Sequence, residues 1–292
     1  MRIKGIATLV RLMSFTLAVV CAAICCSPRC DAQILQLPDQ QRYDTDSLKR
    51  AFADQHYYFG LYKDNYFIFG PALNHKPNRH NTNVKFQISV AQKLTKATLP
   101  FNSYLYLFYT QKVFWNVLES SMPMTDLNFN PGIGITKPIF IKNRFIGTAG
   151  IILEHESNGR DSIQSRSWER ISFVGSVMVD PNFVVSAKFW IPIIDGVNNK
   201  DLLKYVGIYQ VGFQCQSNDR KFSLSVMLAR RARGMFNFNT TVEAAWRWSL
   251  KSNQYLFAQF YNGYGEGLLN YKQYTCHIRL GIVIKPTLFS QF

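Results

Sequence analysis

The chain has 292 residues, which is enough for one large domain or two small ones. Apolar residues make up 47% and aromatic residues 15%, whereas only 17% are charged, against about a quarter in an average soluble domain. The formal net charge of +15 suits a protein that meets anionic surfaces such as phospholipid head groups, lipopolysaccharide or nucleic acid. Because the basic residues are scattered rather than clustered with stacking aromatic residues, we expect no nucleic-acid partner.

The first 32 residues have the three parts of a secretory signal peptide. They begin with positive charges, continue with an apolar stretch over residues 12–26, and end in a small-x-small cleavage site at residues 30–32. The apolar stretch is too short for an N-terminal membrane anchor, and its cysteines lack the flanking pattern of a lipoprotein signal. We therefore predict a signal peptide over residues 1–32, a periplasmic lead-in segment over 33–55, and the main domain over 56–292.

After the lead-in segment, the chain is a succession of alternating segments separated by turns. In the second of them, four apolar residues alternate with Lys, Gln and Ser over residues 84–90. Successive side chains of a strand point to opposite faces, so each segment reads as a strand with one apolar face. We count twelve segments, at residues 57–69, 84–90, 104–115 and 128–137, two around residues 154–170, and then 182–191, 203–216, 222–228, 236–248, 254–264 and 274–285.

Strands of about ten residues, even in number and fully charged on their polar face, are typical of transmembrane β-barrels. A soluble β-sandwich is the alternative. Aromatic residues at the segment ends, the export signal and the terminal Phe292 favour the membrane. We expect an all-β fold, a single antiparallel transmembrane β-barrel of about 12 strands. Its lumen should hold a hydrogen-bonded network of Lys85, Lys188, Glu243, Arg247, His277 and Arg279.

Two adjacent segments carry polar residues on an otherwise apolar face. His155 and Ser157 share the parity of Ile151 and Leu153, so in a strand they project from the more apolar face. Glu169 falls on the apolar side of the next segment, where an unpaired carboxylate would be costly. A hydroxyl nucleophile, an imidazole base and an orienting acid are the parts of a Ser-His-acid triad. We therefore favour a catalytic site over the alternative, strand ends that mark the edge of a membrane or core.

The loop between these two segments adds further groups. Asn158-Gly159 supplies a tight turn whose backbone N–H groups could face an oxyanion. Ser165, Asp161 and backbone carbonyls are hard oxygen groups that could hold calcium, although their spacing alone favours a solvated loop. A nucleophile on the outside of a barrel meets only what lies in the bilayer, so the predicted substrate is a membrane lipid ester.

Residues 155–160 read His-x-Ser-Asn-Gly-Arg and residues 165–170 read Ser-Arg-Ser-Trp-x-Arg, and together they resemble the active-site signature of the outer-membrane phospholipase A family. The likeness extends along most of the chain after the signal peptide, at residues 64–66, 84–87, 109–112, 119–121 and 261–266. It implies a barrel in the bacterial outer membrane that hydrolyses acyl esters of glycerophospholipids and is active as a calcium-bound homodimer. The site would lie on the outer face of the barrel, near the outer leaflet.

The resemblance also implies a role for each matching residue. Ser157 is the expected nucleophile, His155 the general base, and the Gly159 N–H part of the oxyanion hole. Calcium would be held by the Arg160 carbonyl and the Ser165 hydroxyl. The remaining implied residues are a calcium ligand from the partner subunit, which matches Ser120 or Ser121, and a polar dimer contact, which matches Gln111.

One residue departs from the family pattern, because Glu169 stands where the family has Asn. We expect the carboxylate to orient the imidazole of His155 equally well and to stabilise the imidazolium more strongly. The departure keeps open a catalytically inactive barrel with a porin-like or adhesive role. A lipid A deacylase, which uses the same chemistry on another lipid, is a second alternative.

Overall fold

The computed structural model describes residues 60–95, 99–142, 144–232, 237–249 and 252–286. The predicted signal peptide and lead-in segment, the start of the first predicted strand, and Phe292 lie outside these ranges. Within the ranges, regular structure is almost entirely β-strand. No helix in this part of the chain has both the length and the apolar character needed to cross a membrane.

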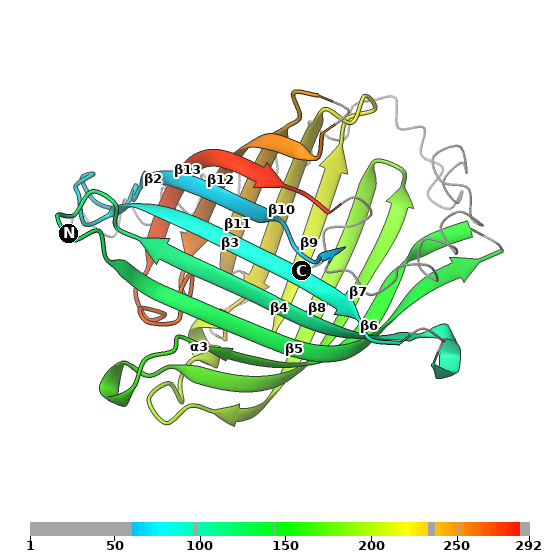
Figure 1. The fold of residues 1–292 in the computed structure, drawn as a ribbon, viewed down its shortest axis with the longest axis horizontal. Coiled ribbons are helices and arrows are strands. Elements are labelled where there is room, and N and C mark those ends of the chain that lie inside the picture. Colours follow the sequence, from blue (N-terminus) through cyan, green and yellow to red (C-terminus); the bar gives the residue numbers. More distant parts are fainter. Residues whose placement is uncertain (1–59, 96–98, 143, 233–236, 250–251, 287–292) are drawn as a thin grey trace. The chain divides into compact units, whose positions relative to one another are not determined.

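The strands form one antiparallel sheet that closes on itself (Figure 1). From β2 onward each strand pairs with the next one along the chain, and β13 pairs with β2 to complete the barrel. The short β1 precedes β2 on the same edge of β3, so the described residues build a barrel of twelve strand positions, as predicted. The bounds are β1 (Gly60–Leu61), β2 (Asn65–Pro71), β3 (Thr82–Lys93), β4 (Tyr104–Trp115), β5 (Met124–Ile141), β6 (Arg144–Ser157), β7 (Ser167–Asp180), β8 (Phe183–Asp195), β9 (Tyr209–Gln216), β10 (Phe222–Arg230), β11 (Phe238–Trp246), β12 (Gln254–Gly263) and β13 (Thr275–Ile284).

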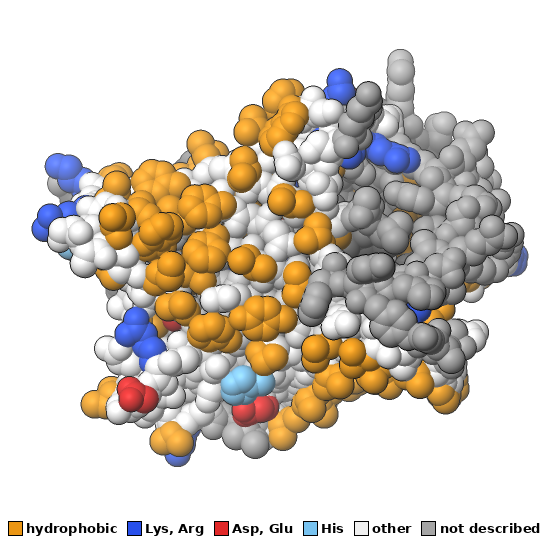
Figure 2. All heavy atoms as spheres, in the orientation of Figure 1, with side chains coloured by type: hydrophobic (Ala, Val, Ile, Leu, Met, Phe, Trp, Pro, Cys, Tyr) orange, Lys and Arg blue, Asp and Glu red, His pale blue; other side chains and the backbone are white. Residues whose placement is uncertain are grey.

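Strand β6 illustrates how the two faces of the barrel wall differ. Ile151 and Leu153 are 53% and 48% exposed on the outside, whereas Ile152 and Glu154 are 0% and 3% exposed and face the interior. The same alternation in the other strands gathers hydrophobic side chains on the exterior (Figure 2). An exposed apolar surface of this extent is favourable when lipid covers it, as it does in transmembrane barrels.

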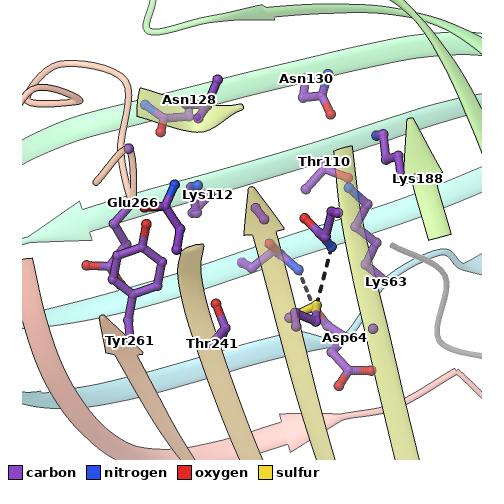
Figure 3. Close-up of a pocket in the computed structure, with 18 of the residues that line it drawn as sticks. Lys63, Asp64, Thr110, Lys112, Asn128, Asn130, Lys188, Thr241, Tyr261 and Glu266 are labelled. Carbon is purple, nitrogen blue, oxygen red and sulfur yellow. Dashed lines mark hydrogen bonds between the residues drawn. The ribbon is translucent and has the colours of Figure 1, made fainter. Parts of the chain in front are cut away.

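The interior of the barrel holds charged side chains that are paired with one another. Glu266 accepts hydrogen bonds from Lys85 at 3.0 Å and from Arg279 at 2.7 Å, and Lys188 donates to Glu154 at 2.8 Å. Such pairing offsets the cost of removing the charges from water. A cavity of about 320 Å³ remains among these groups, and polar side chains from strands on all sides point into it (Figure 3).

Of the predicted lumen residues, Lys85, Lys188, Glu243 and Arg279 are buried and hydrogen-bonded, whereas His277 is buried with its Nδ1 3.4 Å from Glu266 and without a hydrogen bond among the described residues. Arg247 is different. It lies past the end of β11, is only partly buried, and donates to the Ser252 carbonyl in the adjoining turn. Alternation predicts which residues face the interior only within a strand, and Arg247 lies one residue beyond the end of β11.

Two predicted segments differ from the observed strands. The single strand expected over residues 203–216 is wrong in its first part, because the helix α3 (Leu203–Val206) precedes β9. Gly207 ends this helix with φ 83°, and a Cβ there would overlap the Arg230 carbonyl oxygen, so only glycine permits the close turn. The segment expected over residues 57–69 is interrupted at residues 62–64, between β1 and β2.

Candidate active site

The β6–β7 hairpin brings the predicted base and acid together on the outer face of the barrel. In the register of the two strands, His155 lies opposite Glu169. The His155 Nδ1 and Glu169 Oε1 atoms are 2.8 Å apart, and the two side chains are 42% and 32% exposed. An imidazole that donates its Nδ1–H to the carboxylate keeps the Nε2 lone pair free to accept a proton. This arrangement is suited to general base catalysis.

Ser157 is the last residue of β6 and lies opposite Ser167. Because it follows His155 by two positions, it belongs to the same face of the strand. Leu153 precedes them on that face, aligned with Ile133 of β5 and Ile171 of β7. The serine, histidine and glutamate therefore stand where an apolar band of the barrel wall ends.

Most of the connections at this end of the barrel are longer than those at the opposite end. Residues 158–166 join β6 to β7 and residues 264–274 join β12 to β13, whereas the opposite end has short turns such as residues 181–182. Long loops at one end and short turns at the other are typical of the extracellular and periplasmic ends of outer-membrane barrels. The candidate site thus lies at the level where lipid head groups meet the extracellular loops.

Asn158 organises the loop that follows Ser157. It is 2% exposed, and its backbone N–H donates to the Arg166 carbonyl at 3.0 Å. Its side-chain oxygen accepts from the backbone N–H groups of Arg166 at 2.9 Å and Arg160 at 3.3 Å, while its amide nitrogen donates to the Gln164 carbonyl at 2.8 Å. Sequence reasoning treated Asn158 only as part of a turn. The capacity of an Asn side chain to bond nearby backbone was the signal for this role.

Gly159 occupies a position that no other residue fits well. Its φ is 62°, in the left-handed region, and a Cβ built there would lie 2.8 Å from the Phe129 Cε2 atom. Both the backbone conformation and the adjacent ring therefore require glycine. Phe129 was not singled out from the sequence, because only the register of β5 against β6, which pairs it with Ser157, places its ring beside this turn.

Arg160 and Ser165, the two residues predicted to hold calcium, lie in the same loop. The Arg160 guanidinium donates to the Gln164 side chain at 2.5 Å and to the Thr125 carbonyl at 2.7 Å, which ties the loop to the start of β5. Within the described residues, the Arg160 carbonyl and the Ser165 hydroxyl take part in no hydrogen bond. Two hard oxygen atoms are thus available for a cation such as calcium.

Ser120 and Ser121 lie in the loop of residues 116–123 and are both exposed. In the part of the chain that is described, no hydrogen bond joins either serine to the loop of residues 158–166. Glu119 holds their loop, because it accepts from Asn116 Nδ2 at 2.6 Å and pairs with His80 Nδ1 at 3.0 Å. The hydrogen bond from Asn116 and then that from His80 lower the pKa of Glu119.

Gln111 lies on β4, on the outer face. Its side-chain oxygen accepts a hydrogen bond from the Tyr109 hydroxyl at 3.2 Å. The strand register pairs Gln111 with Phe129, and Phe129 in turn with Ser157. Gln111 and Ser157 therefore belong to one cross-strand row of the barrel wall and are separated by a single strand.

Comparison with known proteins identifies the family. A model of the phospholipase A1 family matches residues 47–284. The chain belongs to the phospholipase A1 family. Relatives named phospholipase A1 occur in Proteus vulgaris, 29% identical over 220 residues and covering 73% of each chain, and in Escherichia coli K12, 29% identical over 214 residues and covering 71% of each chain. This phospholipase A1 family member is thus a phospholipase of the bacterial outer membrane.

Solved structures of phospholipases share the barrel. The outer membrane phospholipase A of Escherichia coli superimposes with a TM-score of 0.70 at 25% identity, covering 79% of this chain and 99% of that one. The Salmonella typhi outer membrane phospholipase, described as a dimer with bound calcium, gives a TM-score of 0.69 at 25% identity, covering 77% of this chain and 91% of that one. The sequence match to the phospholipase A1 family and the structural match to outer membrane phospholipases therefore agree.

Proposed function

We propose that this phospholipase hydrolyses acyl esters of glycerophospholipids through Ser157, His155 and Glu169, with calcium and as a homodimer. The observation that carries the proposal is the His155–Glu169 pair, 2.8 Å apart on the lipid-facing side of the barrel and two residues from a serine. A carboxylate and an imidazole are costly on a lipid-facing surface even when they are paired, so their presence there argues for a function.

In the proposed reaction, the Ser157 hydroxyl gives its proton to His155 Nε2 while its oxygen attacks the acyl carbonyl carbon. The Gly159 N–H donates to the oxyanion of the tetrahedral intermediate. His155 then returns the proton to the glycerol oxygen as the ester bond breaks, which releases a lysophospholipid and leaves an acyl-enzyme. A water molecule, deprotonated by His155, attacks that ester, releases the fatty acid and restores Ser157.

Glu169 has two effects on His155 in this scheme. Its carboxylate accepts the Nδ1–H, which fixes the orientation of the ring and the tautomer in which Nε2 is unprotonated. Its negative charge also favours the imidazolium that forms when Ser157 gives up its proton. We therefore treat the replacement of the family Asn by Glu169 as a functional variant.

Calcium fits the oxygen atoms of the loop after Gly159. We assign it to the Arg160 carbonyl and the Ser165 hydroxyl of one subunit and to the partner subunit's Ser120, with the adjacent Ser121 as the alternative. The assigned ligands are neutral oxygen atoms, which calcium accepts. Bound there, calcium would supply positive charge beside the oxyanion.

A homodimer would explain two features of the chain. The partner subunit's Ser120 would complete a calcium site for which one chain offers two free oxygen atoms. Gln111, an amide on the lipid-facing side, would gain a second hydrogen-bond partner in addition to Tyr109, and polar groups in lipid favour such pairing. The related Salmonella typhi phospholipase is described as a dimer with bound calcium, which supports a calcium-bound dimer for this chain.

The test compares the wild type with Ser157→Ala on phosphatidylethanolamine in detergent micelles, first with calcium and then with EDTA. We expect hydrolysis only by the wild type with calcium. Equal activity of the two proteins would refute Ser157 as the nucleophile, and activity that EDTA leaves unchanged would refute the role of calcium. The same assay on lipopolysaccharide distinguishes a phospholipase from a lipid A deacylase.

A further inference from the structure

A second set of charged residues lies directly behind the candidate catalytic pair. Glu154 and Glu156 flank His155 in β6, and Arg170 follows Glu169 in β7. Because side chains alternate, these three point into the barrel while His155 and Glu169 point outward. The Arg170 Nε donates to Glu154 at 2.7 Å and its NH1 group donates to Glu156 at 2.7 Å. One guanidinium therefore binds the residues on both sides of His155.

Further contacts hold this cluster in place. Glu154 also accepts hydrogen bonds from Ser172 at 2.5 Å and from Lys188 at 2.8 Å and 2.9 Å. The Arg170 guanidinium carbon lies 4.0 Å from the centre of the Trp168 ring. Arg170 and Glu154 are 6% and 3% exposed, so their charges interact with little screening by water. The planar guanidinium is suited to a bridge between two carboxylates, which a lysine ammonium cannot reproduce.

The backbone ladders that flank this part of the hairpin are interrupted, and on the β5 side the Asn130 side chain takes over by donating to the His155 carbonyl at 2.8 Å. Pro131 of β5 has no N–H to donate, and the pairs of β5 with His155 and Glu156 are missing between Phe129–Ser157 and Gly132–Glu154. On the other side, the register of β7 against β8 shifts between Glu169 and Arg170, and Arg170 is paired with Pro192. The hydrogen-bonded ladders on both sides of the hairpin, β5–β6 and β7–β8, are therefore irregular at the level of His155 and Glu169.

We propose that Arg170, through Glu154 and Glu156, is a positioning residue that fixes His155 opposite Glu169. The two carboxylates and the guanidinium cross-link β6 to β7 on the inner face at the level where the flanking ladders are irregular. Without this bridge, the β6–β7 hairpin could shift or twist locally and separate the imidazole from the carboxylate on the outer face. The inference rests on the proposed function of His155 and Glu169, and it assigns the inner cluster a part in the reaction beyond barrel stability.

The barrel offers a matched control for a purely structural effect. Arg279 of β13 is 1% exposed, donates to Glu266 at 2.7 Å and to Asn83 at 3.0 Å, and belongs to the same polar interior. Its strand pairs with β12 and β2, and its side-chain contacts among the described residues are with Glu266, Asn83 and Phe114, none of which belongs to β6 or β7. Replacing either arginine by lysine keeps the positive charge and removes the bridging geometry.

The experiment measures thermal unfolding in detergent, kcat and KM on phosphatidylethanolamine with saturating calcium, and the fraction of Ser157 labelled by a sulfonyl fluoride. For Arg170→Lys we expect a folded barrel, an unchanged KM, and a kcat that is roughly ten- to a hundredfold lower per labelled site. Arg279→Lys should lower the unfolding temperature to a similar extent and leave kcat unchanged. A kcat for Arg170→Lys within twofold of wild type, or an equal loss of kcat in both variants, would overturn the inference.

Two further variants keep the test decisive if Arg170→Lys does not fold. Glu156→Gln retains an oxygen acceptor for the Arg170 NH1 group and should keep most of the kcat, whereas Glu156→Leu removes the bridge and should lose it. Equal activity of the two variants would contradict the proposal. Ser157→Ala distinguishes failure of this inference from failure of the proposed function. If the Ser157→Ala protein is active, the triad assignment itself is wrong. If it is inactive, the triad assignment stands and the Arg170 and Glu156 variants test only the positioning role of Arg170.

Discussion

The substitution Glu169→Gln isolates the residue in which this chain departs from the family pattern. The amide keeps an oxygen that can accept the Nδ1–H of His155 and removes the negative charge. Glu169→Ala, in contrast, removes both. If the charge contributes to catalysis, the first variant should be impaired in kcat and the second should be impaired further, because the ring then also loses its orienting hydrogen bond.

The size of the effect follows from the geometry of the pair. With 2.8 Å between His155 Nδ1 and Glu169 Oε1, the charge centres of an imidazolium and the carboxylate are roughly 4 Å apart, where two unit charges attract by about 1 kcal/mol in water and about 4 kcal/mol near a protein surface. The side chains are 42% and 32% exposed, so solvent screening places the value toward the lower limit. We expect a loss of about 1 to 2 kcal/mol, or roughly five- to thirtyfold in kcat.

The assay measures initial rates on phosphatidylethanolamine micelles at saturating calcium, normalised to the folded fraction of each variant. Asp219→Asn is the control, since it removes an exposed carboxylate from the turn between β9 and β10, at the opposite end of the barrel. It should match the wild type. If Glu169→Gln and Glu169→Ala both retain wild-type rates, then Glu169 does not assist His155 and the triad assignment is wrong.

Three other substitutions test separate parts of the site. Gly159→Ala should lower kcat roughly a hundredfold, because alanine is disfavoured at φ 62° and its Cβ would lie 2.8 Å from Phe129; an unchanged kcat would show that activity does not require glycine in this turn. Glu119→Gln should raise the calcium concentration that gives half-maximal activity, since this carboxylate accepts hydrogen bonds that hold the loop of Ser120, the proposed calcium ligand of the partner subunit; an unchanged requirement would separate that loop from calcium binding. The hydrogen bond from the Tyr271 hydroxyl is the largest cause of the lowered pKa of Asp201. This contact therefore stabilises the loops of Asp201 and Tyr271 at any pH above the ordinary pKa of 3.8, and the stabilisation is lost as the pH falls through the lowered pKa. Tyr271→Phe should therefore lower the unfolding temperature at neutral pH but not in strong acid, and a difference that persists in acid would contradict this sign.

The sequence predicts the wall of the barrel well because the period of two in a strand is a local property. The parity of Ile151 and Leu153 is sufficient to place His155 and Ser157 outward, and the pattern that resumes at Ile171 places Glu169 on the same side. Their juxtaposition depends only on hairpin register, which strand parity strongly restricts. Strand length is less predictable: β5 has 18 residues and extends beyond the predicted segment of residues 128–137 at both ends, because its pairing with β4 and β6 continues there.

The parts that the sequence did not predict depend on contacts between distant elements. The turn at Gly207 exists because the chain passes against the Arg230 carbonyl, and nothing near residue 207 indicates that neighbour. Phe129 meets Gly159 through the β5–β6 register, and Asn158 bonds residues that are six and eight positions away. Periodicity reports which face a residue occupies, whereas these interactions depend on which strand lies beside that face.

The position of Glu169 along its strand explains why a carboxylate is tolerated on a surface that faces lipid. Halfway across the hydrocarbon layer an ionised side chain is strongly disfavoured, but close to the head groups the cost falls steeply. Glu169 is the third residue of β7, beside the longer loops, remains 32% exposed and has His155 as a hydrogen-bond partner. Two residues further along the same face stands Ile171, where the apolar band begins. The acid therefore occupies a level of the barrel wall where it keeps both contact with water and its hydrogen bond to the imidazole, while the bilayer lies directly beside it.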